Sequence, residues 1–225
     1  MLLFIYVWHW EVVFNHSTLL ALWIGIKTTV LVSMLGLSLG VAFGLATATA
    51  RVFRIPVLSQ IVYGYVDFFR TTPVLVQLIW IFYVLPVMAG INLSAFVAGV
   101  ITLGLNAGAF LSEIFRAGLL SINQGQRDAA KVLGLSQLQA LWYVLIPQAV
   151  RRVLPAAVNV FISLVKDSSL VSIIAVSDLT YQAESAVAQT YRPFELYTAL
   201  AVVYFLLTYP LSLAASAVER RFRVT

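Results

Sequence analysis

Residues 125–136 read Gly-Gln-Arg-Asp-Ala-Ala-Lys-Val-Leu-Gly-Leu-Ser, a short polar stretch set between long apolar segments. The pattern predicts two short helices joined by a tight turn. Asp128 is expected in the first turn of the first helix, where a negative charge suits the positive end of the helix dipole. Gly134 is expected to end that helix, because glycine adopts a positive φ without strain.

The second helix of this hairpin is expected to begin at Ser136, with Gln139 three residues later in the spacing of a capping box. Pro147 is expected to end it. An apolar stripe on one face supports the helix and consists of Leu138, Leu141, Trp142 and Leu145. The segment 120–148 is therefore predicted to be a compact, rigid knob.

Composition indicates an all-α integral membrane protein with a single domain over 1–225. The 225 residues are 61% hydrophobic and 10% charged, with a mean hydropathy of +0.95, whereas soluble domains are about 25% charged. The chain has no cysteine, and its two histidines, His9 and His16, have no carboxylate cluster near them, so we expect no metal site. No GxxxxGK[ST] segment is present, which predicts that the chain itself does not hydrolyse ATP. It also lacks a Ser/His/Asp set and a buried carboxylate pair, so we expect no enzyme.

About five membrane spans are expected, over about 19–50, 57–89, 93–118, 153–177 and 196–218, with an outer loop at 178–195 that carries a short helix. The uncharged part of the first span alone makes roughly 35 Å of helix, enough for a hydrocarbon core of about 30 Å. Gly36, Gly40 and Gly44 leave one face of that span bare. Another helix can approach there, either from this chain, which we favour, or from a second copy.

Two spans carry internal features. The second is expected to kink or loosen at Pro73. The fourth holds Lys166 and Asp167 about 20 Å of helical rise from its start, where a charge costs roughly 2.5–3.5 kcal/mol. These two charges are expected to face the bundle interior or a water-filled path; alternatively, the helix ends early and they lie in a wet outer vestibule. Glu113 and Arg116, one turn apart, are expected to pair.

The basic residues predict the orientation of the chain. Eleven of the fourteen Lys and Arg residues fall on one side of the expected topology, which predicts an N-terminus outside and a cytoplasmic hairpin and C-terminus. The net charge of +5 follows this topology, so no nucleic acid partner is expected. The eleven are Arg51, Arg54, Arg70, Arg116, Arg127, Lys131, Arg151, Arg152, Arg220, Arg221 and Arg223.

The hairpin resembles the cytoplasmic loop of bacterial binding-protein-dependent ABC importer permeases. That loop reads Glu-Ala-Ala, three residues, Gly, nine residues, Ile, one residue, Leu-Pro; here Asp128 replaces the Glu and Ile146 the Leu. The resemblance implies a type I ABC importer permease-like fold in which this loop is a coupling helix docked on a separate ATPase. It assigns that contact to Gly125, Asp128, Ala129, Ala130 and Gly134.

The run Phe-Phe-Arg-Thr-Thr-Pro at 68–73 resembles a motif of the polar amino acid branch of these permeases, which serves histidine, glutamine, glutamate or arginine. Arg70, Thr72 and Pro73 are thus candidates for structural or gating roles, as is Lys166. Read without the resemblance, Arg70 is an anchor at the inner interface and Pro73 a helix start.

The resemblance also implies the partners: a second permease subunit, identical or related, an ATPase dimer that holds ATP and Mg²⁺, and an external solute-binding protein. No cofactor is expected on this chain. The substrate is expected to be a polar or charged L-amino acid, moved by alternating access. Candidates for the substrate path are Asn106 and Asp167 first, then Ser168 and Gln77.

Two other classes stay open from the residues alone. A stand-alone ion-coupled secondary transporter or channel would use Lys166 and Asp167 as its ion site. A membrane scaffold protein would transport nothing and would dock some other partner through the hairpin.

Overall fold

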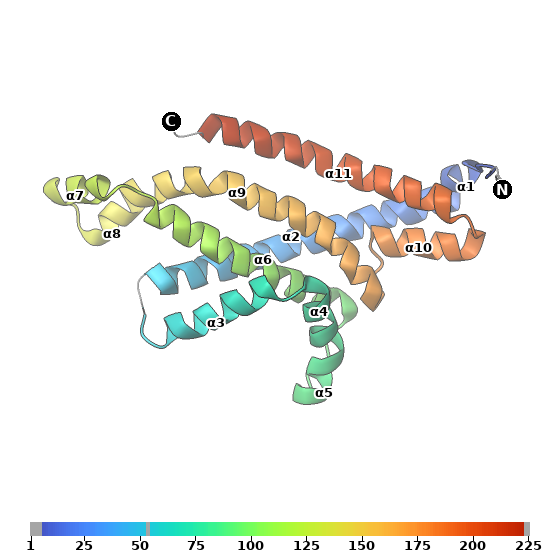
Figure 1. Cartoon of the computed structure of the whole chain (residues 1–225), viewed down its shortest axis with the longest axis horizontal. Helices are drawn as coiled ribbons and strands as arrows, with labels where there is room; N and C mark the ends of the chain where they lie inside the picture. The colour runs from blue at the N-terminus through green and yellow to red at the C-terminus, as the bar shows by residue number, and fades with distance from the viewer. Residues whose placement is uncertain (1–5, 53–54, 223–225) are drawn as a thin grey trace, which may run out of the picture.

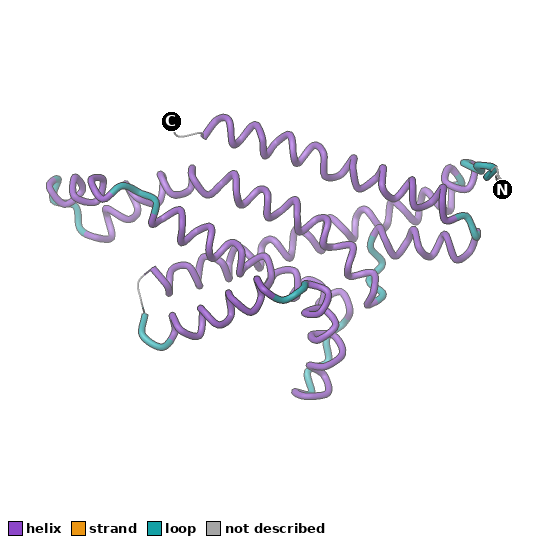
Figure 2. Tube along the Cα trace, viewed as in Figure 1, coloured by secondary structure: helices purple, strands orange, loops and turns teal. Residues whose placement is uncertain are grey.

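A computed structural model describes residues 6–52 and 55–222, with only the backbone of Arg127 and Phe222. The described chain is helical, with short connections and no strand (Figure 2). Four long helices run along the long axis of the molecule (Figure 1): α2 (His16–Val52), α6 (Ala95–Leu120), α9 (Ile146–Asp167) and α11 (Pro193–Phe222).

Shorter elements join them. They are α1 (Glu11–Phe14), α3 (Leu58–Thr71), α4 (Val74–Ile79), the π-helical turn η1 (Trp80–Val84), α5 (Leu85–Ala89), α7 (Gln124–Val132), α8 (Gln137–Ala140), the π-helical turn η2 (Leu141–Leu145), the 3₁₀ turn η3 (Ser168–Ile174) and α10 (Leu179–Thr190). Helices α7 and α8 lie at one end of the molecule, and α1 and α10 lie at the other (Figure 1).

Four helical segments of the described chain are long and apolar enough to cross a membrane: His16–Val52, Ala95–Leu120, Gln137–Ile174 and Pro193–Arg221. A fifth crossing is possible if the pair Leu58–Thr71 and Val74–Ala89 counts as one span, although the two parts are bent by 112°. The segment 57–89 is therefore no single straight span. Its break lies at Pro73, where the sequence predicts a kink, and α4 and α5 project sideways from the bundle (Figure 1).

Glycines bring α2 and α6 into close contact. A Cβ on Gly40 would lie 3.0 Å from Ala107 Cβ, and a Cβ on Gly44 would lie 2.8 Å from Leu111 Cβ. From the other side, a Cβ on Gly104 would lie 2.6 Å from Leu39 Cδ2. The small-residue face predicted on the first span therefore packs against a helix of the same chain.

The hairpin confirms two predicted helix signals. Gly134 has a φ of 72°, and Ser136 and Gln139 form both hydrogen bonds of a capping box. Asp128 is not in the first turn, which corrects the prediction. The Asn123 side chain accepts a hydrogen bond from Gly125 N at 2.9 Å and starts α7 earlier, so Asp128 lies in the second turn.

Pro147 does not end the helix that begins after Ser136. The π-helical turn η2 lies just before Pro147. The wide turn accommodates the missing backbone N–H of proline, so the helix can continue. The helical path therefore runs from Gln137 to Ile174; it begins well before the expected span of 153–177 and ends slightly before the end of that span. Its last part is the 3₁₀ turn η3, and the path ends at Ala175, whose φ is 60°.

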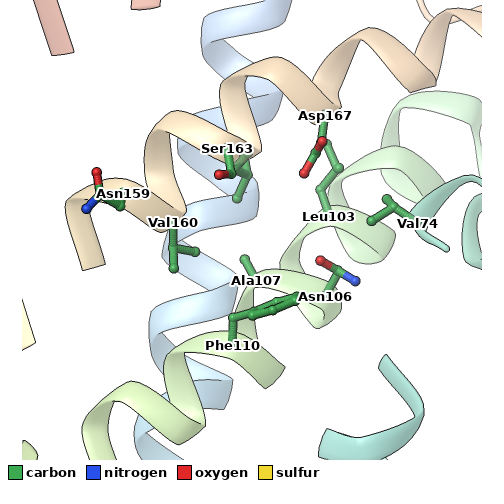
Figure 3. Close-up of a pocket in the computed structure, with 10 residues that line it drawn as sticks. Val74, Leu103, Asn106, Ala107, Phe110, Asn159, Val160, Ser163 and Asp167 are labelled. Carbon is green, nitrogen blue, oxygen red and sulfur yellow. The ribbon is translucent and has the colours of Figure 1, made fainter. Parts of the chain in front are cut away.

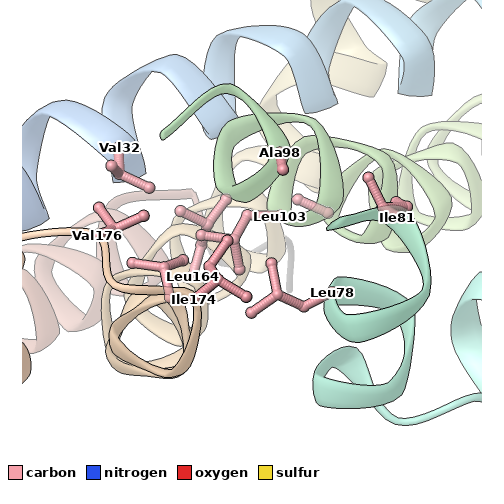
Figure 4. Close-up of a cluster of buried hydrophobic side chains, with 10 residues drawn as sticks. Val32, Leu78, Ile81, Ala98, Leu103, Leu164, Ile174 and Val176 are labelled. Atoms are coloured by element: carbon pink, nitrogen blue, oxygen red, sulfur yellow. The ribbon is translucent and has the colours of Figure 1, made fainter. Parts of the chain in front are cut away.

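The largest buried hydrophobic cluster lies where α2, the bent segment, α6, α9 and η3 meet (Figure 4). None of its fully buried members comes from α11; they are Val32, Leu78, Ile81, Ala98, Leu103, Ala107, Leu164, Val171, Ile174 and Val176.

A second junction connects α10 to the bundle at the end of the molecule opposite α7 and α8 (Figure 1). A Cβ on Gly25 of α2 would lie 2.7 Å from Leu179 Cα, and Leu179 N donates to Thr29 Oγ1 at 3.1 Å. The fully buried Asp178 caps α10 by accepting from Tyr181 N at 2.9 Å. The predicted outer loop 178–195 is thus mostly one helix held against α2.

Candidate functional site

A cavity of about 370 Å³ lies between α4, α6 and α9 (Figure 3). Most of its wall is apolar, and its polar groups come from Asn106 on α6 and from three side chains on α9. The full lining consists of Val74, Leu103, Asn106, Ala107, Phe110, Asn159, Val160, Ser163, Leu164 and Asp167.

The α9 side chains form one polar stripe. Asn159, Ser163 and Asp167 follow one another at four-residue spacing, which puts them on the same helix face. Asp167 lies at one end of the cavity near Asn106 and Val74, and Asn159 lies at the other end (Figure 3). This spacing is visible in the sequence, and it would have added Asn159 and Ser163 to the candidates.

Asn106 is held by its amide nitrogen. Its Nδ2 donates to the Phe69 carbonyl at 2.9 Å and to Gln77 Oε1 at 3.2 Å. Its Oδ1 accepts no hydrogen bond from the described part of the chain and points to the cavity in Figure 3. A fixed acceptor oxygen therefore faces the space beside Asp167.

Gln77 lies outside this cavity. It is only 3% exposed, and its Nε2 donates to the carbonyls of Phe69 and Thr72, each at 3.0 Å, and to Thr72 Oγ1 at 2.8 Å. These bonds satisfy backbone groups that the break at Pro73 leaves without helical partners. On its other side, Gln77 lines a separate, apolar cavity of about 660 Å³ under the α4–α5 segment.

Ser168 also lies outside the cavity. It is fully buried, and its hydroxyl donates to the Val165 carbonyl at 2.8 Å. Lys166 faces away from Asp167, toward a cavity of about 280 Å³ against α11 that Tyr204 and Thr208 also line. The two adjacent charges therefore belong to different surfaces of α9, as positions about 100° apart on a helix should.

Three arginine side chains surround the carboxylate of Glu113, one turn along α6 from Phe110. Glu113 accepts from Arg116 Nη2 at 2.8 Å, which confirms the predicted pair, and from Arg51 Nη1. Arg70 Nη1 lies 3.9 Å from the same carboxylate. Arg51 is buried and also packs over Tyr63, with its Cζ 4.1 Å from the ring centroid. Sequence reasoning missed the contacts of Glu113 with Arg51 and Arg70, because they join residues far apart in the chain.

The hairpin residues lie at the end of the molecule. Gly125, Asp128, Ala129 and Gly134 are exposed, whereas Ala130 is 2% exposed and packs inward. Two large apolar side chains beside them, Val132 and Leu133, are 88% and 77% exposed. The tip of the hairpin thus presents an apolar surface that this chain does not cover.

The described residues hold no group of three or more His, Asp or Glu side chains arranged for a metal ion. The arrangement is suited to bind a small polar solute between two helices, with Asp167 and Asn106 Oδ1 as acceptors.

Comparison with known proteins shows what the chain is similar to. Residues 36–224 match the family model described as binding-protein-dependent transport system inner membrane component. The chain is 36% identical over 201 residues to the glutamine transport system permease protein GlnP of Escherichia coli (strain K12), covering 89% of this chain and 92% of that protein.

A second relative is the probable glutamine ABC transporter permease protein GlnP of Bacillus subtilis (strain 168). It is 38% identical over 211 residues, covering 92% of this chain and 96% of that protein. Among solved structures, a crystal structure of an amino acid ABC transporter with histidines superposes with a TM-score of 0.88 at 36% identity, covering 96% of this chain and all of that one.

Proposed function

Because the chain belongs to the family of binding-protein-dependent transport system inner membrane components, we propose that it moves a polar or charged L-amino acid through the membrane in an ATP-driven importer. It is a transporter component and not itself an enzyme. Its family and its several apolar helices make it a multi-pass protein of the inner membrane.

The observation that carries the proposal is the cavity between α6 and α9. Its volume of about 370 Å³ falls in the range of about 300–1,000 Å³ for small-molecule sites. The ammonium group of an amino acid needs acceptors, and Asp167 and Asn106, which line the same cavity, can supply them. Relatives that are glutamine permeases favour a substrate of this class.

The hairpin would couple ATP hydrolysis to transport. We assign the contact with a separate ATPase dimer, which holds ATP and Mg²⁺, to the exposed residues of 125–134 and to the apolar side chains of Val132 and Leu133. The distribution of Lys and Arg favours a cytoplasmic hairpin and C-terminus and an outer N-terminus. The opposite ends occupied by α1 and by the end of α11 suit this topology (Figure 1).

The proposed mechanism is alternating access. A second permease subunit, identical or related, would face this one, and an external binding protein would deliver the amino acid. Closure of the ATPase dimer would move the two hairpins together and turn the bundles outward, and hydrolysis would reset the inward-open state. Such coupling requires that the hairpin make different contacts in the two states.

A stand-alone ion-coupled transporter is less well supported. That function would need Lys166 and Asp167 to share one ion site, yet the two side chains line separate cavities on different surfaces of α9.

Uptake by an Asp167→Asn variant tests the proposal. In proteoliposomes that contain the complete transporter and its binding protein, we expect this variant to lose at least about 90% of amino acid uptake, since one lost charge-assisted bond costs about tenfold. Asp67→Asn, which removes an exposed carboxylate from α3 outside the cavity, is the control and should transport normally. Wild-type uptake by Asp167→Asn, with normal membrane insertion, would remove the cavity from the path.

A further inference from the structure

Arg70 is the least engaged of the three arginines around Glu113. Arg116 binds the carboxylate at 2.8 Å, and Arg51 donates to it from a side chain that is 4% exposed. Arg70 stays at 3.9 Å, and its side chain is 40% exposed. Three guanidinium groups share one carboxylate, so the cluster carries excess positive charge. Arg70 is the member available to bind another anion.

Arg70 also lies next to the cavity. Its Cζ is 5.6 Å from the ring centroid of Phe110, which lines the cavity wall. Glu113 follows Phe110 by three residues on α6, so it lies on the same face, one turn nearer the hairpin. The backbone beside Arg70 is fixed to the site as well, because the Phe69 carbonyl accepts from Asn106 Nδ2 at 2.9 Å.

The charges around the cavity suit the two ends of a zwitterion. Asp167 offers a carboxylate for an ammonium group, whereas no Lys or Arg side chain lines the cavity among the described residues. Arg70, which packs against the lining residue Phe110, is a cation that the geometry provides for a substrate carboxylate.

We propose that Arg70 binds the α-carboxylate of the transported amino acid on the hairpin side of Phe110, exchanging its contact with Glu113 for one with the substrate. This inference rests on the proposed function and adds a specificity-determining residue to it. The exchange leaves Glu113 paired, because Arg51 and Arg116 remain on it. A guanidinium group suits the task, since its planar fork binds a carboxylate through two parallel hydrogen bonds.

The test compares substrates with and without the carboxylate. Binding of labelled glutamine and arginine, and of their decarboxylated forms 4-aminobutanamide and agmatine, is measured on the permease–ATPase complex in nanodiscs. We expect wild type to bind at least one amino acid about tenfold more tightly than its amine. In Arg70→Gln that ratio should fall to within about twofold, through weaker binding of the amino acid alone.

Arg116→Gln is the matched control, because it also removes one guanidinium group from Glu113. It should keep the wild-type ratio. An unchanged ratio in Arg70→Gln, or an equal loss in Arg116→Gln, would overturn the role of Arg70.

Asp167→Asn separates this failure from failure of the proposed function. If it weakens binding of both amino acid and amine while Arg70→Gln leaves their ratio intact, only the Arg70 inference falls. If wild type binds neither compound, or if Asp167→Asn changes nothing, the cavity is not the substrate site and both proposals fall.

Discussion

Glu113 shows how one side chain fixes three helices. Its carboxylate on α6 holds Arg51 from the end of α2 and Arg116 from its own helix, and it attracts Arg70 from α3. Arg51 is buried and its Nε has no hydrogen-bond partner in the described structure. Glu113 is therefore the counter-charge on which burial of this arginine depends.

Glu113→Gln should destabilise the bundle by about 3 kcal/mol, because removal of one partner leaves a buried charge uncompensated. Asp128→Asn is the comparison: it breaks the exposed pair with Lys131 at 3.8 Å and should cost no more than about 0.5 kcal/mol. Thermal unfolding in detergent, followed by size-exclusion chromatography, measures both. Equal midpoints for the two variants would contradict this role of Glu113.

Asp178 predicts a pH dependence of stability. Burial raises its pKa to about 6, against the hydrogen bonds from the backbone of Tyr181 and Thr180 and from the Tyr204 hydroxyl, which lower it. An unfolded aspartate has a pKa of about 3.9. The folded state therefore binds the proton more tightly, so the ionised side chain opposes folding at neutral pH and stability rises as the pH falls from about 6 to about 4.

The size of this gain is about 2–3 kcal/mol from the pKa difference. Asp178→Asn should lack the gain and keep the helix cap, since asparagine caps as well as aspartate. The difference in unfolding midpoint between the variant and wild type is measured from pH 7.5 to pH 4.5 and should shrink as the pH falls. A constant difference would show that Asp178 does not titrate in this range.

At the residue scale, sequence reasoning found the groups that local spacing places together. The Glu113–Arg116 pair and the Ser136–Gln139 capping box lie within one helical turn and are confirmed. It also named Asn106 and Asp167, which the structure brings to one cavity. Gln77 and Ser168 have the same polar chemistry, but their helices turn them into hydrogen bonds within the bundle, which spacing alone does not reveal.

Among the elements, α2 and α6 pack closely along several glycines. Their glycines let two backbones approach so closely that single methyl groups no longer fit. The spacing of Gly36, Gly40 and Gly44 predicts such a contact. It does not name the partner helix, because a bare face suits a helix of the same chain and a second copy equally well.

Gly44→Ala should destabilise the protein by about 1–2 kcal/mol, because its Cβ would lie 2.8 Å from Leu111 Cβ and 3.2 Å from Phe115 Cε2. Gly64→Ala is the matched control on α3, where a Cβ meets nothing within 4 Å. That change should be neutral or stabilise by up to about 1 kcal/mol, since alanine is the better helix former. Unfolding midpoints that move in the same direction would argue against a tight α2–α6 contact.

The broken segment α3–α4 marks the limit of prediction at this scale. Pro73 locates the break in the sequence, yet a bend of 112° is far larger than a proline kink requires. Two side chains bind the backbone at the bend: Gln77 of α4 donates to the carbonyls of Phe69 and Thr72, and Asn106 of α6 donates to the Phe69 carbonyl. The hydrogen bond from Asn106 joins residues that are far apart in the sequence. It depends on how the helices pack, so local sequence does not predict it.

For the whole molecule, composition was sufficient to predict an all-α membrane protein of about five spans. The described helices and the match to a solved amino acid ABC transporter confirm this fold. Span ends were harder to predict. Pro147 was expected to stop a helix that in fact continues to Ile174 through a π-helical turn, because a wide turn leaves no clear signal in the residues.

Gly134→Val tests whether the hairpin couples ATP hydrolysis to transport. Gly134 has a φ of 72° and open space around it, so valine strains the backbone by about 1–2 kcal/mol without a clash. We expect fewer amino acids transported per ATP hydrolysed, with the bundle still folded. Gly90→Val carries the same strain at a φ of 67°, also in open space, but far from α7, and should keep the wild-type ratio. A normal ratio in Gly134→Val would argue that the hairpin does not couple.

The composition of the main buried cluster bears on how the protein is made. Its fully buried members end at Val176 and include nothing from α11. The ribosome therefore finishes every part of that cluster before the last helix is synthesised. The cluster needs no residue of α11 to close, and α11 packs outside it along α9 and α10.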